Sequence, residues 1–103
     1  MPDAKPKARP YLALANDFAA RKDTPRDFLE RCIGVIEARE KDVLAFVATN
    51  LPAARAAGDA STVRWQQGKP LSSIDGMPIG IKDVIETADM PTGMGSPLYD
   101  GWR

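Results

Sequence analysis

The stretch from Asp75 to Ser96 constrains the fold more than any other part of this chain. It places Lys82 in a short apolar run, residues 79–84, with Gly-Met-Pro before the run and a loop rich in glycine and proline after it. A run of this length between turn residues predicts a strand. In a strand, Lys82 shares a face with Gly80, and a glycine there leaves room for another group beside the amine. We therefore expect the chemistry of the chain at Lys82.

Composition narrows the chemistry further. The 103 residues carry 14 Lys and Arg against 14 Asp and Glu, so no basic surface favours nucleic acid, and no apolar run is long enough to span a membrane. We therefore expect this segment to bind neither nucleic acid nor a membrane. The chain has no histidine and only one cysteine. This excludes serine–histidine and cysteine–histidine catalysis, and a metal site of histidines or several cysteines, within these residues. A base must then be a lysine, a carboxylate or a tyrosine.

Two helices are predicted in the first third of the chain. Residues 1–10 hold three prolines and no apolar core of a secretory signal, which predicts a disordered tail and, as the default, a cytoplasmic location. Apolar residues at helical spacing predict a short helix over residues 11–21. Thr24 followed by Pro25 predicts the start of a second helix. Its broad apolar stripe indicates packing between neighbours, with Cys32 as a buried thiol and not a nucleophile.

A strand and a third helix follow. Residues 43–49 are nearly all apolar, which predicts a strand covered on both faces. Asn50 then caps a helix from about Leu51, and Gly68 marks its end. Trp65 is either a partial cover of the core or an exposed contact. The predicted face of this helix toward a sheet is made of small residues: Ala53, Ala56, Ala57, Ala60 and Val63.

Strands that alternate with helices predict an α/β fold with a parallel or mixed sheet. Residues 43–49 and 79–84 supply two strands, and two strands leave both edges of the sheet unpaired. The sheet is therefore expected to be incomplete in this chain. Further strands should come from elsewhere.

Residue chemistry alone leaves two interpretations of Lys82. A lysine in a dry pocket loses its proton more readily, and a neutral amine acts as a base. Alternatively, Lys82 ends a strand, extends to solvent and pairs with Asp83 or Glu86. Nucleotide binding is not predicted, because the Gly76–Asp83 and Gly93–Gly95 patterns lack the spacing of a phosphate loop or a dinucleotide fingerprint.

The sequence Gly-Met-Pro-Ile-Gly-Ile-Lys-Asp-Val-Ile-Glu-Thr-Ala-Asp-Met-Pro-Thr-Gly-Met-Gly-Ser resembles the N-terminal part of the amidase signature family. This family includes bacterial amidases, fatty-acid amide hydrolases and the amidase subunit of the glutamyl-tRNA amidotransferase. The order of the preceding helix, apolar segment and alanine-rich helix is also similar. The resemblance covers roughly residues 24–103.

The resemblance implies a layered α/β/α fold with a mixed sheet, of which residues 11–103 form the N-terminal portion of a single amidase domain. It implies hydrolysis of a small linear amide through a serine acyl-enzyme, with Lys82 as the base of a Ser–cisSer–Lys triad and no cofactor or metal. In the family, both serines belong to a Gly/Ser-rich segment that lies beyond Arg103, so these residues alone are expected to be inactive.

Other assignments stay open from the sequence. Gly95 and Ser96 are weak candidates for substrate binding, although a turn hydrogen bond is the favoured role of Ser96. The identity of the amide, the choice between hydrolysis and transfer to a second substrate, and a homodimeric state are not fixed. The alternative function is a non-catalytic protein-interaction module that uses exposed apolar faces.

Overall fold

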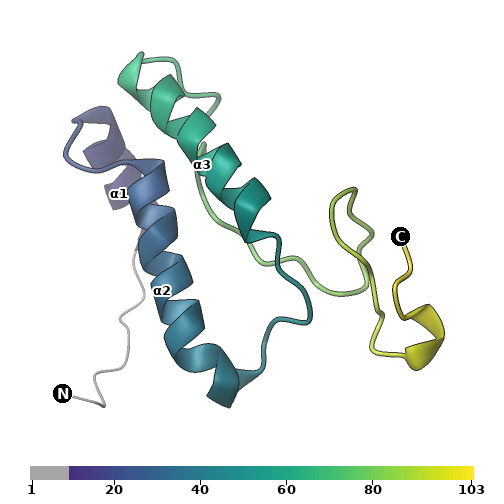
Figure 1. The fold of residues 1–103 in the computed structure, drawn as a ribbon. Coiled ribbons are helices and arrows are strands. Elements are labelled where there is room, and N and C mark those ends of the chain that lie inside the picture. The colour runs from purple at the N-terminus through teal and green to yellow at the C-terminus, as the bar shows by residue number, and fades with distance from the viewer. Residues whose placement is uncertain (1–9) are drawn as a thin grey trace.

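Figure 1 shows the computed structural model, which describes residues 10–103. The disordered tail predicted for residues 1–10 lies, apart from Pro10, outside the described residues. The elements in chain order are the helices α1 (Tyr11–Ala19), α2 (Pro25–Val43) and α3 (Leu51–Gln66), followed by a long irregular segment and the short 3-10 helix η1 (Pro97–Tyr99).

The two longer helices begin where the sequence predicts. Thr24 Oγ1 accepts a hydrogen bond from the Asp27 N–H at 3.1 Å, and Pro25 occupies the first position of α2. Asn50 Oδ1 accepts from the Ala53 N–H at 3.3 Å at the start of α3. These bonds satisfy first-turn amides that have no partner within the helix. Both predicted helix starts are confirmed.

The core is a cluster of aromatic rings where α1 meets α2 and the end of α3. The Phe18 ring is almost fully buried, and its centroid lies 6.1 Å from that of Tyr11, 6.4 Å from Phe28 and 5.8 Å from Trp65. Edge-on contacts of this kind add to the free energy of burying the rings. Trp65 is half-buried, so it is a partial cover of this core.

Helices α2 and α3 lie side by side and antiparallel (Figure 1). Gly58 makes their close approach possible, because a Cβ added there would lie 3.2 Å from Leu29 Cδ2 and 3.6 Å from Arg26 Cα. Toward solvent, Arg55 and Arg26 both bind the Glu30 carboxylate, at 2.7 Å and 3.0 Å. Gly58 thus lets α3 approach α2 closely at this point.

The small-residue face predicted for α3 is wrong for the described residues. The four alanines and Val63 are exposed, and the face that packs instead carries Gly58, Ser61 and Thr62. Glycine allows closer approach than alanine, and the two hydroxyls find partners in the contact: Thr62 Oγ1 accepts from the Arg26 N–H at 3.1 Å. A helix face that combines glycine with hydrogen-bonded hydroxyls therefore packs here in preference to the face of alanines.

Neither predicted strand forms within residues 10–103, so the described chain is helical and the α/β sheet is not seen. Val43 is the last residue of α2, Leu44 turns the chain with φ 52°, and the Glu40 carboxylate binds the amides of Ala45 and Phe46. Residues 79–84 also make no ladder. A strand needs a neighbouring strand to satisfy its backbone groups, and these segments have none here.

Large apolar side chains remain exposed in the segments that were predicted as strands. Val47 is 78% exposed and Ile79 is 72% exposed. The stripe on α2 is also only partly covered: Val35 is exposed and Cys32 is half-buried, not buried as predicted. The prediction that Cys32 is buried is therefore wrong for this structure, in which its side of α2 is only partly covered.

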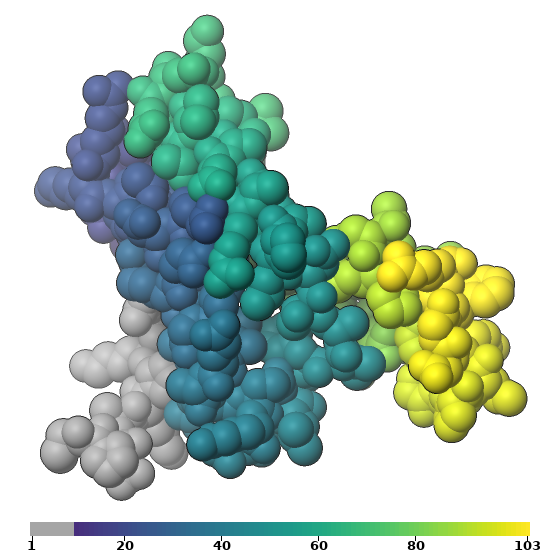
Figure 2. All heavy atoms as spheres, viewed as in Figure 1, coloured from purple at the N-terminus to yellow at the C-terminus, as the bar shows by residue number. Residues whose placement is uncertain are grey.

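The shape of the chain is open. Its radius of gyration is 15.6 Å, whereas about 13 Å is expected for a compact domain of this length. Figure 2 shows why: the helices form one body, and residues from about 80 onward form a second lobe beside it. The segment that leaves α3 connects the two lobes, whereas residues 44–50 connect α2 with α3.

Asp75 ties the first lobe together through its side chain. Its carboxylate accepts hydrogen bonds from Ser61 Oγ at 2.9 Å, from Arg64 Nε at 2.7 Å and Nη2 at 2.6 Å, and from the Leu71 N–H at 3.0 Å. The Arg64 guanidinium, aided by the Leu71 amide and the Ser61 hydroxyl, holds the pKa of this carboxyl well below its ordinary range, although burial acts in the opposite direction.

The backbone of Asp75 extends the same network to α1. Its carbonyl oxygen accepts from Tyr11 Oη at 2.8 Å and from Trp65 Nε1 at 2.9 Å. Burial, together with the nearby Asp75 charge, raises the pKa of Tyr11, which keeps its hydroxyl a donor. One residue thus joins α1, α3 and the loop that leads toward Lys82.

Gly76 is expected to tolerate no side chain. Its φ is +94°, and a Cβ there would lie 2.7 Å from both Pro25 Cβ and Ser61 Oγ. Backbone strain and overpacking together predict that Gly76→Ala lowers the free energy of unfolding by about 2–4 kcal/mol. Denaturant unfolding measures this effect.

The matched control is Gly68→Ala. Gly68 has a similar φ, +70°, but a Cβ there would meet no atom within 4 Å. Only backbone strain, about 1–2 kcal/mol, is expected. Equal losses for the two variants would contradict the packing role of Gly76.

Candidate active site

Lys82 lies in the second lobe, immediately before a turn. The Ile85 N–H donates to the Lys82 carbonyl oxygen at 3.0 Å, which closes this turn. The Lys82 side chain is exposed, and among residues 10–103 no carboxylate lies within ion-pair distance of it. The predicted pairing with Asp83 or Glu86 is thus not formed in this structure. A Cβ added at Gly80 would meet no atom within 4 Å, so the space beside this glycine is open. Room beside the Lys82 amine stays a prediction, because residues 79–84 form no strand that would place the two residues on one face.

A cleft of about 380 Å³ lies beside Lys82. One wall is residues 45–48, and the other comes from residues 81–95. Lys82 and Asp83 are the charged residues of a lining that is otherwise mostly apolar, with the remaining members Ala45, Phe46, Val47, Ala48, Ile81, Val84, Ile85, Thr87, Met90, Pro91, Met94 and Gly95. Parts of both segments that were predicted as strands, residues 45–48 and 81–84, therefore line this cleft.

Asn50 connects the two sides of the cleft. Its Oδ1 caps α3, and its Nδ2 donates to Asp89 Oδ2 at 3.2 Å. The loop of residues 87–90 is thus held near the start of α3. A single amide side chain links the helical lobe to the lobe that carries Lys82.

Thr92 links the last residues of the described chain to the turn that follows Lys82. This side chain is almost fully buried; its N–H donates to the Trp102 carbonyl at 2.8 Å and its Oγ1 donates to the Ile85 carbonyl at 3.4 Å. Trp102 Nε1 in turn donates to Glu86 Oε1 at 3.1 Å. These bonds fold residues 92–102 back onto the turn that follows Lys82.

Of the weak candidates, Gly95 lines the cleft and Ser96 does not. Ser96 Oγ accepts from the Leu98 N–H at 3.3 Å and caps η1, which is the turn hydrogen bond favoured by the sequence. Substrate binding by either residue stays a prediction, as does the catalytic role of Lys82.

Asp83 is the residue that the sequence interpretation missed. The sequence suggests a pairing of Asp83 with Lys82, whereas in the structure its Oδ1 accepts from the Gly93 N–H at 2.9 Å. The only signal in the sequence was an aspartate ten residues before a glycine-rich loop, which specifies no contact by itself.

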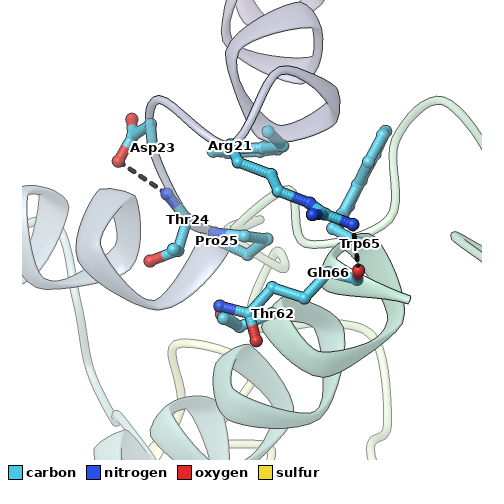
Figure 3. A pocket seen from close by; sticks show the side chains of 8 residues that line it. Arg21, Asp23, Thr24, Pro25, Thr62, Trp65 and Gln66 are labelled. Carbon is cyan, nitrogen blue, oxygen red and sulfur yellow. Dashed lines mark hydrogen bonds between the residues drawn. The ribbon is translucent and has the colours of Figure 1, made fainter. Parts of the chain in front are cut away.

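A second, smaller hollow of about 70 Å³ lies where the turn between α1 and α2 meets the end of α3 (Figure 3). Arg21 reaches across it to donate to the Gln66 carbonyl at 2.8 Å, and Asp23 accepts from the Thr24 N–H at 2.8 Å. The hollow is far smaller than the cavities that hold small molecules, which span about 300–1,000 Å³.

Two further features are absent from residues 10–103. No group of three or more metal-ligating side chains occurs in this part of the chain. Within the same residues, no helix combines the length and apolar character needed to cross a membrane.

Comparison with known proteins supports the family resemblance. The model of the family described as Amidase matches residues 27–103. The chain therefore belongs to the amidase family, as the lysine block indicated. No solved structure shows a significant match.

The chain is similar to the A subunits of the glutamyl-tRNA(Gln) amidotransferases of several bacteria. It is 42% identical to that of Chloroflexus aggregans (strain MD-66 / DSM 9485) over 86 residues, which are 84% of this chain and 18% of the relative. It is 35% identical to that of Mycobacterium bovis (strain BCG / Pasteur 1173P2) over 91 residues, 87% of this chain and 18% of the relative. The chain thus spans about a fifth of the length of these curated relatives.

Proposed function

We propose that this chain is the N-terminal portion of a single amidase domain, residues 11–103, in an enzyme that hydrolyses the C–N bond of small linear amides. Membership of the amidase family supports the amide chemistry. The observation that supports the assignment of Lys82 as the base is its place in the lining of the 380 Å³ cleft, with open space beside Gly80.

Lys82 is proposed as the general base of a Ser–cisSer–Lys triad. A neutral amine removes the proton from the nucleophilic serine through the middle serine, and attack on the amide carbonyl gives an acyl-enzyme while ammonia or an amine leaves. Water then completes hydrolysis. Both serines and the oxyanion donors are expected outside residues 1–103, so the 103-residue chain alone is expected to be inactive, and no cofactor is required.

The relatives named as parts of amidotransferases favour a second outcome for the same chemistry. In that case the ammonia passes to a second substrate instead of solvent. A cytoplasmic location and a homodimeric state complete the proposal; the single cysteine is compatible with a reducing compartment.

Ammonia release from the intact enzyme tests the function. With a panel of primary amides, including glutamine, we expect ammonia in at least one reaction, and none from residues 1–103 alone. Adding glutamyl-tRNA and ATP separates transfer from hydrolysis, because transfer consumes the ammonia. An intact protein that binds a partner chain but releases no ammonia from any amide would favour the interaction module instead.

A further inference from the structure

Asp83 makes two contacts to the same short loop. Its side-chain Oδ1 accepts from the Gly93 N–H at 2.9 Å, and its backbone carbonyl accepts from the Met94 N–H at 2.9 Å. Consecutive amides of one loop are therefore bound by one residue. This residue directly follows Lys82 in the chain.

Gly93 packs closely against the Asp83 carboxylate. A Cβ added to Gly93 would lie 3.1 Å from Asp83 Oδ2, so glycine lets the carboxylate approach the backbone. The next residue, Met94, has φ +54°, a conformation that costs energy for a side chain other than glycine. The bond from its N–H to Asp83 holds the loop in that conformation.

These contacts fix the loop relative to the base. Asp83, Met94 and Gly95 all line the cleft with Lys82. Lys82 and Asp83 are consecutive residues of the turn of residues 82–85. The hydrogen bonds between Asp83 and the loop therefore also restrain the backbone of Lys82. Thr92, bound to the Trp102 and Ile85 carbonyls, anchors the start of the same loop.

We propose that Asp83 is a positioning residue for amide hydrolysis: its hydrogen bonds to Gly93 and Met94 hold Lys82 and the 92–95 loop in fixed relation within one wall of the cleft. This inference rests on the proposed function of Lys82. Asp83 itself transfers no proton. Its carboxylate acts only as a hydrogen-bond acceptor for the loop.

The test compares Asp83→Ala, Asp83→Asn and Lys82→Ala in the intact amidase, with Asp42→Ala, an exposed aspartate of α2, as the matched control. Asp83→Ala is expected to lower kcat by about 10- to 100-fold, because a displaced catalytic group loses rate steeply, with KM within about twofold. Asparagine keeps the Oδ1 acceptor, so Asp83→Asn should retain kcat within about threefold. Asp42→Ala should match the wild type.

Hydrogen exchange provides a readout that does not depend on turnover. The Gly93 amide should exchange faster in Asp83→Ala and remain protected in Asp83→Asn. Wild-type kcat in Asp83→Ala, unchanged exchange at Gly93, or equal impairment of the Asn and Ala variants would each overturn the positioning role of Asp83.

The outcomes separate this inference from the proposed function. An inactive Lys82→Ala with a fully active Asp83→Ala rejects the positioning role of Asp83 and keeps the base. A fully active Lys82→Ala rejects the base and, with it, the positioning role of Asp83 in hydrolysis, even if faster exchange at Gly93 in Asp83→Ala shows that Asp83 holds the loop.

Discussion

Replacing Lys82 by alanine in the intact amidase is expected to lower the rate of ammonia release by about 10³-fold or more. General base catalysis contributes about 10²- to 10⁴-fold, and Lys82, which lines the cleft of this histidine-free segment, is the residue proposed to supply it. Lys82→Arg should fail almost equally, since a guanidinium stays protonated and cannot accept a proton.

The control for this prediction is Lys69→Ala. Lys69 is an exposed lysine in the loop after α3, and it does not line the cleft. Its loss should leave kcat and KM unchanged. Equal losses in Lys69→Ala and Lys82→Ala would mean that charge, and not position, governs the rate.

Replacing Asp75 by alanine is expected to destabilise the helical lobe strongly. It leaves the Ser61 hydroxyl and the Leu71 amide without their acceptor and removes the partner of Arg64. Because several polar groups around this buried carboxylate lose their hydrogen-bond acceptor at once, the free energy of unfolding should fall by about 3 kcal/mol or more. Thermal unfolding and hydrogen exchange in α1 and α3 measure it.

The same network predicts a dependence on acid. The pKa of Asp75 is lower in the folded state than in the unfolded chain, so its contribution is complete above about pH 4, its ordinary range, and is lost as pH falls below that. The free energy of unfolding of the wild type should therefore fall more steeply below pH 4 than that of Asp75→Asn. Parallel curves for the two proteins would contradict the assignment.

The helices of this chain were predictable because their signals are local. Thr24 with Pro25, and Asn50 three residues before Ala53, specify helix starts through bonds within a single turn. The family, and the place of Lys82 within the motif of that family, were likewise predictable from one continuous block of sequence. What the block left open is which other segment faces it, and the structure supplies residues 45–48.

The strands were not predictable from local pattern, because a strand is completed only by its neighbour. Val47 and Ile79 have the composition of buried strand residues but remain exposed in this chain. The roles of Asp75 and Asp83 were missed for a related reason. Tyr11 and Asp75 are 64 residues apart, and nothing in either local sequence specifies the bond that joins them.

The face of α3 that packs is not the alanine face. Counting apolar residues favours Ala53, Ala56, Ala57 and Ala60, whereas the contact with α2 includes Gly58 and Thr62. Two helices approach closely where the residues between them are small and where any buried hydroxyl has a hydrogen-bond partner. The spacing of apolar residues in the sequence indicates neither feature.

The most direct test of the central claim is ammonia release during the first turnover, measured by rapid quench of the intact enzyme with excess amide. This step isolates acylation, in which Lys82 is proposed to act. The wild type should release ammonia at least as fast as its steady-state rate, and Lys82→Ala should release it about 10³-fold more slowly while remaining folded. First-turnover release at the wild-type rate by a folded Lys82→Ala variant would contradict the account.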